Sequence, residues 1–299
     1  MTKHREIAQR LVRNACLFGV KKRDMGDAHR QLIRSRQTAV DFEDCMANFL
    51  AFRAEGKVPA DGPFLRAEAD EFLFLNSLMW RQKTLDQHRQ ALDKILCVVL
   101  PRYHANVPTR VQSRAYTNHE VNLIVNQMSE RHALSVRLIH ATGMRVFEPL
   151  SLADIDKLPR SPERPWRDDL FAGLADFVLC CTQGKGGLVR GVAIPRRVYE
   201  EISDSRFSAP TTVTDRKKVY TPVFDLAAGQ ALSIAFTRAS QKALGFSFGI
   251  HGLRHSYVQR RLEQLQELGF SFRDSLEICA QEVGHFRLQI TLHYTTKRT

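Results

Sequence analysis

The stretch His251-Gly-Leu-Arg-His-Ser-Tyr-Val-Gln259 places two histidines four residues apart with an arginine between them. Within a helix expected over residues 251–268, His251 and His255 share one face. That spacing suits zinc, but Gly252 stands where the HExxH motif requires a glutamate, and no third ligand follows at a suitable interval. Two interpretations remain: a packed histidine beside an ion-paired arginine, or a cationic site for an anion.

The composition favours an anionic partner. The chain has 299 residues, of which 43% are hydrophobic and 25% charged, and its formal net charge is +12. This composition is typical of a foldable chain that is long enough for two domains. The positive excess favours nucleic acid ahead of an anionic membrane surface, and a basic solubilising surface is the alternative.

The cysteines and the apolar segments bear on the compartment. The six cysteines show neither CxxC nor a metal-ligand spacing, so we expect buried, reduced thiols of a cytosolic protein. The first residues lack the apolar region of a signal peptide, and no run approaches the roughly 18 apolar residues of a membrane span. We therefore expect a soluble cytoplasmic protein, or a nuclear one in a eukaryotic cell.

The sequence pattern of the first third of the chain predicts helices. Apolar spacing predicts helices over 40–55, 65–79 and 83–100, with Thr84 as the N-cap of the third. Residues 1–37 are strongly basic, which indicates either a solvated helix face or contacts to a DNA backbone. The candidate DNA-contacting residues along the chain are Lys21, Lys22, Arg23, Arg34, Arg36, Arg81, Lys83 and Arg114.

The rest of the chain predicts a second domain. Proline and basic residues make 101–114 the best linker candidate, so we expect a helical N-terminal domain over 1–105, a linker over 106–114 and a second domain over 115–299. Thr117-Asn-His-Glu120 forms a capping box. The further helices are expected over 132–142, 196–203, 228–243, 251–268 and 272–282. The only convincing β signal is a hairpin over 176–195 with Lys185 at its Gly-rich turn. The predicted fold class is mostly α with a small antiparallel sheet.

Three further blocks accompany the HGLRH helix. The first is Ala141-Thr-Gly-Met-Arg-Val-Phe-Glu148, with an arginine after a Thr-Gly break and a glutamate three residues on. The second is Gly184-Lys-Gly186 in the hairpin turn. The third is Val283-Gly-His285, followed nine residues after the histidine by Tyr294. Each block alone is a weak signal, whereas all of them in order over 141–294 make a strong one.

Together the blocks resemble the tyrosine recombinase (phage integrase) family, whose pattern is TGxRxxE, a hairpin lysine, HxLRH, and GH with a tyrosine nine residues on. SRAYTNHEV (113–121) resembles the entrance to its catalytic domain, and KTLDQHRQALDKIL (83–96) the end of its core-binding domain. The resemblance implies a helical DNA-binding N-terminal domain and a mainly helical catalytic domain with a small antiparallel sheet.

The residue types fit phosphodiester cleavage. The transition state carries extra negative charge, which metal ions or fixed cations must neutralise, and no acidic metal cluster is evident. Arg145 and Arg254 each offer a planar fork that matches two phosphate oxygens, unless they form ion pairs far apart. In the resemblance, His251 and His285 fill the two histidine positions and bind the phosphate or orient the nucleophile.

The remaining roles follow from the resemblance. Lys185 would protonate the departing 5′ oxygen once its surroundings lower its pKa, although a solvated turn lysine is the alternative. Glu148 would steady the catalytic arginine or lysine, or else be an ordinary helix-end carboxylate. Tyr294 would be the nucleophile, with Tyr257 and Tyr220 as rivals. His255 is assigned to helix packing.

The resemblance implies a site-specific DNA recombinase that cleaves and rejoins duplex DNA through a 3′-phosphotyrosyl link, without metal, ATP or other cofactor. It further implies a homo-tetramer on two DNA sites, a role in a mobile genetic element and a bacterial cytoplasmic location. A type IB topoisomerase-like enzyme and a non-cleaving DNA-binding protein are the alternatives. The loop over 157–169 reads as an insertion of no assigned function, and the five residues after Tyr294 leave little room for a helix that docks on a neighbouring protomer.

Overall fold

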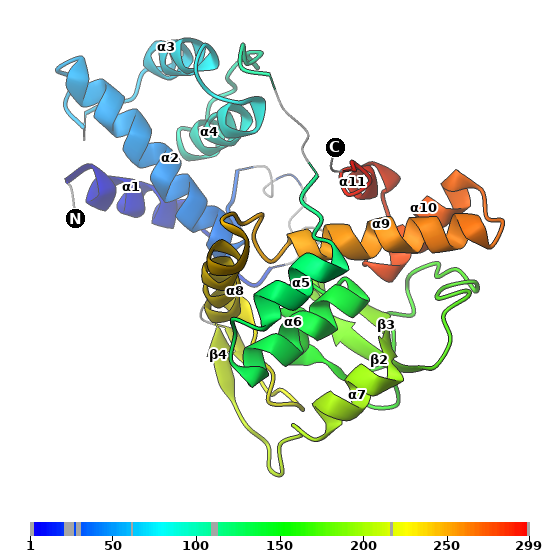
Figure 1. Ribbon diagram of the computed structural model, residues 1–299. Coiled ribbons are helices and arrows are strands. Elements are labelled where there is room, and N and C mark those ends of the chain that lie inside the picture. Colours follow the sequence, from blue (N-terminus) through cyan, green and yellow to red (C-terminus); the bar gives the residue numbers. More distant parts are fainter. Residues whose placement is uncertain are drawn as a thin grey trace. The chain divides into compact units, whose positions relative to one another are not determined.

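The computed structural model describes residues 3–20, 27, 31–60, 62–108, 113–215 and 218–297; the side chains of Lys185 and Lys218 lie outside the description. The chain divides into two compact units, Met1–Arg110 and Val111–Thr299. Each unit has its own buried apolar core. Each cluster of core residues comes from one unit alone, and Figure 1 shows the ribbon of both units.

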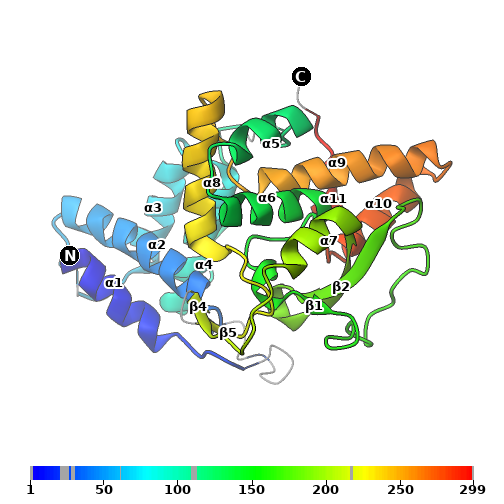
Figure 2. The same cartoon turned by 60° about the horizontal axis from the view of Figure 1, so that its bottom comes forward.

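The described part of unit 1 is helical. Its helices are α1 (Lys3–Asn14), α2 (Arg36–Glu55), α3 (Arg66–Ser77) and α4 (Gln82–Ile95). Helix α2 runs beside α1 (Figures 1 and 2) and buries Phe42, Met46 and Phe49 at helical spacing. Phe72 of α3 packs its ring against Phe49 at 5.4 Å. An aromatic and aliphatic core therefore holds these helices together.

Two expectations for α4 are wrong. The helix ends at Ile95 and not near residue 100, because Cys97 adopts a left-handed backbone conformation (φ 53°) that a helix cannot continue through. The backbone N–H of Leu100 instead donates to Asp93 Oδ1 (2.9 Å). Arg81, not Thr84, is the N-cap residue. The exposed Cys97 and half-exposed Cys16 also correct the expectation that all the cysteines are buried.

Residues 103–106, at the start of the proline-rich stretch, pack on unit 1. The Tyr103 hydroxyl donates to Asp70 Oδ1 (2.9 Å), and the Asn106 N–H donates to the carbonyl of Ser77 (2.9 Å). At the other end, the Tyr116 N–H donates to Ser256 Oγ (2.8 Å) within unit 2. Regular backbone and side-chain bonding therefore fixes both flanks of the stretch.

Unit 2 surrounds a small sheet with helices. Its strands β1 (Ala153–Asp154), β2 (Phe177–Gln183) and β3 (Val189–Pro195) are antiparallel in the order β1-β2-β3, and β4 (Val213–Asp215) pairs with β5 (Lys218–Tyr220). The helices are α5 (Asn118–Val125), α6 (Glu130–Thr142), α7 (Arg196–Ser203), α8 (Gly229–Leu244), α9 (Gly252–Glu267), α10 (Phe272–Glu282) and α11 (Leu288–Leu292). Two short 3-10 turns lie at Glu148–Ser151 and Lys185–Gly187.

The predicted fold class, mostly α with a small antiparallel sheet, is confirmed. The expectation of a single β segment was too narrow, because β1, β4 and β5 are strands of only two or three residues. So short a segment carries no detectable alternation of apolar and polar residues. Within the described ranges, no helix combines the length and the apolar character that crossing a bilayer requires.

Two local features fix where α5 begins and where α6 ends. Thr117 and Glu120 form the predicted capping box at the start of α5, with the Glu120 N–H donating to Thr117 Oγ1 (3.1 Å) and the Thr117 N–H to Glu120 Oε2 (2.8 Å). Gly143 ends α6 in a left-handed conformation (φ 64°), and a Cβ there would lie 2.6 Å from Tyr257 Cδ1 of α9. Glycine therefore lets the end of α6 contact α9 closely.

Candidate active site

Three imidazoles surround the side chain of Tyr294, which follows α11. His251 Nε2, at the start of α9, lies 3.2 Å from the Tyr294 hydroxyl. His255, one turn on, packs its ring edge-on against the phenol, with centroids 4.5 Å apart. The ring of His285, after α10, stacks on the phenol with centroids 5.6 Å apart and an interplanar angle of 14°. The sequence-predicted nucleophile and both predicted histidines therefore lie together.

Arg254 connects three separate segments at this point. Its guanidinium donates to the carbonyl of Gly143 (2.6 Å) after α6 and to the carbonyl of Val283, and it lies 3.1 Å from His285 Nε2. Its Cζ lies 5.9 Å from the centre of the Tyr294 ring. The side chain is fully buried, and its Nε has no partner among the described residues. Burial and the nearby charge of Arg145 lower the pKa of Arg254 to about 9, so it remains charged at neutral pH.

Arg145 is held by Glu148. The guanidinium Nη1 donates to Glu148 Oε1 (2.8 Å), and the Arg145 backbone N–H donates to Oε2 (2.8 Å). Arg145 retains 27% side-chain exposure, whereas the carboxylate is buried. Burial alone would raise the pKa of Glu148, but the charges of Arg190, Arg254 and Arg145 lower it to about 2. Glu148 is therefore an anion that orients the exposed guanidinium of Arg145.

Arg190 of β3 is a site residue that sequence reasoning missed. Its buried guanidinium donates to Glu148 Oε2 (2.7 Å) and to the carbonyl of Glu282. Gly284 makes room for it, because a Cβ there would lie 2.9 Å from Arg190 Cδ. The available signal was a charged residue inside the apolar strand Val189–Pro195, because a charge in a buried strand requires a partner.

The guanidiniums outnumber the carboxylates in this cluster. Arg145 and Arg190 both pair with Glu148, and Arg254 makes no salt bridge within the described residues. Glu282, the next buried carboxylate, pairs instead with Arg261 (2.9 Å). Three positive charges around one negative charge leave an excess of two. Such an excess at a partly buried point favours binding of an anion.

The hairpin turn reaches the same cluster. Gly184 lies so close to the Arg145–Glu148 pair that a Cβ there would meet Glu148 Oε1 at 3.0 Å and Arg145 Nη1 at 3.4 Å. Thr182 of β2 donates its hydroxyl to the Glu148 carbonyl (2.7 Å). The backbone of Lys185 follows directly in the turn, as predicted, while its side chain lies outside the described atoms.

The three imidazoles around Tyr294 are neutral at pH 7. Burial, reinforced by neighbouring positive charges, lowers the pKa of His285 and of His255 to about 3. Desolvation and the charges of Arg254, Arg114 and Arg145 lower the pKa of His251 to about 4, although part of its surface faces solvent. A neutral imidazole keeps one nitrogen lone pair, and in the tautomer with the proton on Nδ1 the His251 Nε2 accepts from the Tyr294 hydroxyl.

The rival tyrosines lie elsewhere. Tyr257 is buried on α9, and its hydroxyl donates to Glu282 Oε2 (2.8 Å), which agrees with a packing role. Tyr220 lies in β5, opposite Val213. Within the described ranges, no three His, Cys, Asp or Glu side chains gather as a metal ion would require.

The candidate DNA-contacting residues are spread over both units. Arg114 is exposed in unit 2, where its Nε donates to the Phe248 carbonyl (3.1 Å) and its charge contributes to the low pKa of His251. Arg81 and Lys83 are exposed at the start of α4. Arg36 is exposed and lies over the Phe18 ring at 5.0 Å, and Arg34 is half-buried. Lys21, Lys22 and Arg23 lie outside the described residues.

The architecture matches solved structures over almost its whole length. The XerH site-specific recombinase bound to difH substrate aligns with a TM-score of 0.55 at 14% identity, covering 98% of this chain and 92% of that one. The chain has the tyrosine recombinase fold. The sequence resemblance is therefore confirmed at the level of the fold.

Two further structures with the recombinase fold also align with almost the whole chain. Lambda integrase (residues 75–356), as a dimer bound to a COC′ core site, aligns with a TM-score of 0.54 at 14% identity and 97% coverage of both chains. The Tn1549 transposon integrase in complex with transposon right end DNA aligns with a TM-score of 0.52 at 12% identity, covering 98% of this chain and 95% of that one. No protein-family model and no curated protein matches the sequence.

Proposed function

We propose that this protein is a site-specific DNA recombinase that cleaves and rejoins duplex DNA through a covalent 3′-phosphotyrosyl intermediate. One observation carries the proposal: Arg254 lies 5.9 Å from the centre of the Tyr294 ring, and the charges of Arg254, Arg145 and Arg190 all act on His285, which stacks on that ring. A DNA phosphate is the anion that this charge would hold, and a phenol is the nucleophile that would attack it.

The guanidiniums of Arg145 and Arg254 would stabilise the negative charge that develops on the phosphate in the transition state. Attack on a phosphodiester produces a five-coordinate phosphorus whose non-bridging oxygens carry more negative charge than the substrate. Arg145 presents its partly exposed fork, the fully buried Arg254 adds positive charge nearby, and both are already oriented by hydrogen bonds. Preorganised cations of this kind lower the barrier because they need not reorganise during the reaction.

The proton transfers balance within the site. The Tyr294 oxygen forms a bond to phosphorus while its proton passes to the neutral His251 Nε2, 3.2 Å away. The bond from phosphorus to the 5′ oxygen breaks, and Lys185 donates the proton that makes a 5′ hydroxyl. In the second step a 5′ hydroxyl of another strand attacks the phosphotyrosine and the protons return. The phosphodiester bond energy is conserved, so resealing needs no ATP, and the guanidiniums supply the positive charge that a metal ion would otherwise provide.

The wider role is proposed on the same basis. DNA substrates appear with the XerH, lambda and Tn1549 proteins, and lambda integrase has been solved as a tetramer on a Holliday junction. We infer that this chain likewise acts as a homo-tetramer on two DNA sites, for a mobile genetic element in a bacterial cytoplasm. Its net charge of +12 supports binding of a polyanion.

The decisive experiment traps the covalent adduct. The full chain is incubated with a pool of nicked duplexes whose flanking bases are randomised, and protein that retains DNA under denaturing conditions is digested and mapped. We expect a nucleotide on the peptide that contains Tyr294. Tyr294→Phe should form no adduct, whereas Tyr220→Phe, which removes a hydroxyl outside the site, should react as the parent does.

Other outcomes identify the alternatives. An adduct that persists in Tyr294→Phe would refute the nucleophile assignment, and no adduct from the parent chain would favour a non-cleaving DNA-binding protein. Once a reactive sequence is recovered, plasmids with two copies of it separate the remaining pair. Recombinant products support the proposal, and relaxation without strand exchange supports a type IB topoisomerase-like enzyme.

A further inference from the structure

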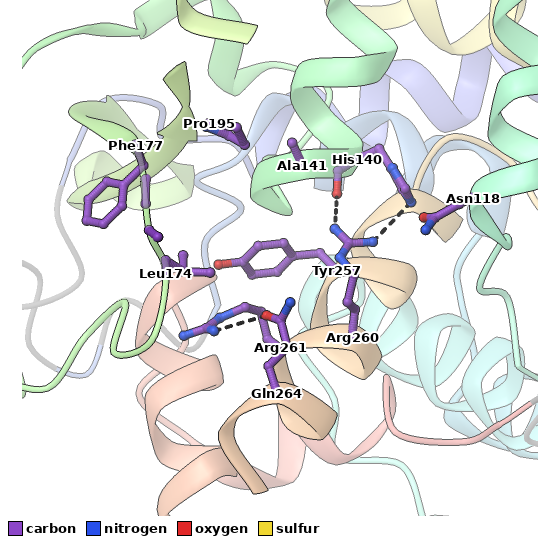
Figure 3. Close-up of a pocket in the computed structure, with 12 residues that line it drawn as sticks. Asn118, His140, Ala141, Leu174, Phe177, Pro195, Tyr257, Arg260, Arg261 and Gln264 are labelled. Carbon is purple, nitrogen blue, oxygen red and sulfur yellow. Dashed lines mark hydrogen bonds between the residues drawn. The ribbon is translucent and has the colours of Figure 1, made fainter. Parts of the chain in front are cut away.

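A second cationic site lies on α9, on a face adjacent to the one that carries His251 and Arg254. Figure 3 shows this pocket, whose volume is about 280 Å³, between α9, the end of α6 and the start of β2. Its lining includes His140, Leu174, Phe177, Tyr257, Arg260 and Gln264. None of these residues takes part in the cleavage chemistry proposed above.

Arg260 has only neutral partners there. Its Nη2 donates to the carbonyl of His140 (2.9 Å), and its Nη1 lies 3.2 Å from His140 Nε2. Burial and the Arg260 charge lower the pKa of His140 to about 3, so the imidazole is neutral. A carbonyl at the end of α6 supplies partial negative charge only. Within the described residues, no carboxylate forms a salt bridge with Arg260.

The neighbouring Arg261, unlike Arg260, is paired with a carboxylate. Its guanidinium pairs with the buried carboxylate of Glu282 (2.9 Å), and that carboxylate also accepts from the Tyr257 hydroxyl (2.8 Å). Arg261 therefore adds no net charge to the pocket. One uncompensated positive charge, that of Arg260, remains in a half-buried cavity, where an unpaired charge is unfavourable.

The walls limit what the anion can be. Leu174, Phe177 and Pro195 line the pocket, and Figure 3 shows them on the other side of the Tyr257 ring from the guanidinium of Arg260, with the ring of Phe177 pointing away from it. The remaining polar groups include the side-chain amides of Asn118 and Gln264. A single guanidinium in a pocket with these apolar walls suits a monoanion with an apolar body better than a phosphate, which carries more charge and needs polar contacts on several sides.

We propose that this pocket binds a small carboxylate, with the carboxylate on Arg260 and a compact apolar body against Leu174, Phe177 and Pro195. A planar carboxylate accepts from the guanidinium N–H groups that His140 leaves free, and it supplies the missing negative charge. The site is independent of Tyr294, so it stands or fails separately from the proposed recombinase activity.

The probe is 4-fluorobenzoate, with 4-fluorobenzamide as its uncharged counterpart, and binding to the full chain is followed by fluorine NMR. We expect the benzoate to bind with a dissociation constant on the order of 1 mM, as expected for a ligand of this size. The benzamide should bind at least about tenfold more weakly, because it cannot compensate the charge of Arg260. Equal affinity for the two probes would overturn the proposal.

Three variants locate the site. Arg260→Gln should weaken benzoate binding at least about tenfold, Arg260→Lys should weaken it less because the charge remains while the planar fork is lost, and Arg238→Gln should change nothing. Arg238 is the matched control, since it is an exposed arginine of α8. If Arg260→Gln fails to fold, the Leu174 methyl resonances of the parent chain still report the ligand. Benzoate that leaves those resonances unmoved, or that binds Arg260→Gln as well as the parent, contradicts the assignment.

Discussion

Both units of the molecule bury arginines, but they neutralise them differently. In unit 1, Arg53 of α2 pairs with Glu68 (3.1 Å) and donates to the carbonyls of Gly62 and Pro63, while its guanidinium lies over the Phe64 ring at 4.5 Å. One carboxylate balances the charge of one cation. In unit 2, three guanidiniums gather around the single carboxylate of Glu148.

The balance of charge around a buried arginine distinguishes a structural ion pair from a candidate binding site for an anion. A buried arginine paired with one carboxylate has no net charge as a pair, and the pair holds the surrounding segments in place. A cluster with surplus positive charge is electrostatically incomplete, and it gains stability when an anion arrives. Unit 2 contains both kinds, because Arg261 with Glu282 repeats the pattern of Arg53 only a short distance from the surplus cluster.

The largest effect is expected from breaking the matched pair. Arg261→Met should lower the free energy of unfolding of unit 2 by about 3–5 kcal/mol, because it leaves the buried carboxylate of Glu282 uncompensated. Arg145→Met should lower it by less than about 1 kcal/mol, since Glu148 keeps Arg190. Urea unfolding followed by Trp166 fluorescence in a Trp80→Phe background reports unit 2 alone. Equal losses for the two variants would erase the distinction.

The reverse ranking is expected for catalysis. Arg145→Gln and Arg254→Gln should each reduce the rate of covalent adduct formation by about 10²–10³-fold, the usual effect of removing one transition-state donor. DNA affinity should be largely retained, because many other phosphate contacts contribute to it. Arg131→Gln, which removes a surface pair with Asp225, is the matched control. A parallel loss of affinity and rate would assign these arginines to binding or folding.

A smaller catalytic loss is expected at Arg190, which acts through its neighbours. It bonds to Glu148, which orients Arg145, and to the carbonyl of Glu282 before the Gly284–His285 turn. Arg190→Met should slow adduct formation by about 10- to 100-fold through misplacement of these groups, at unchanged DNA affinity. Arg190→Lys should recover part of the rate. A rate deficit that is cured by raising the DNA concentration would contradict this positioning role.

The smallest effect is a pH dependence of stability. The pKa of His285 is about 3 in the folded protein and about 6.5 when unfolded. Between these values the unfolded chain binds more protons, so stability falls as the pH drops from 7 to 5, by about 1–2 kcal/mol from this imidazole. His285→Gln should reduce the pH-dependent loss by that amount, whereas His119→Gln, at an exposed position on α5, should not. Identical pH profiles for parent and His285→Gln would contradict the burial argument.

The sequence predicted the parts of the site that lie in recognisable spacings. Arg145, Glu148, His251, Arg254, His285 and Tyr294 all converge; five of them stand at or next to an end of a helix or turn, and Arg254 lies in the first turn of α9. The long helices of unit 2 were predictable because their apolar spacing is regular. These residues and helices are where local pattern and tertiary structure agree.

What the sequence could not supply depends on contacts between distant segments. Arg190 gains its role from Glu148, 42 positions away in the chain, and from Glu282, 92 positions away. The early end of α4 depends on Asp93 capturing the N–H of Leu100. The strands β1, β4 and β5 are too short to show a period; β1 pairs with the distant β2, whereas β4 and β5 pair locally, with Asp215 opposite Lys218.

The most direct test of the surplus charge needs no DNA site. The imidazole pKa values of His251 and His285 are measured by NMR on histidine-labelled protein, in sulfate and in chloride at matched ionic strength. A sulfate held by Arg145 and Arg254 adds negative charge beside both rings, so both pKa values should rise from about 4 and about 3. Arg254→Gln should abolish the response. Imidazole pKa values that are the same in both salts would show that the cluster holds no anion next to Tyr294, and would contradict the account.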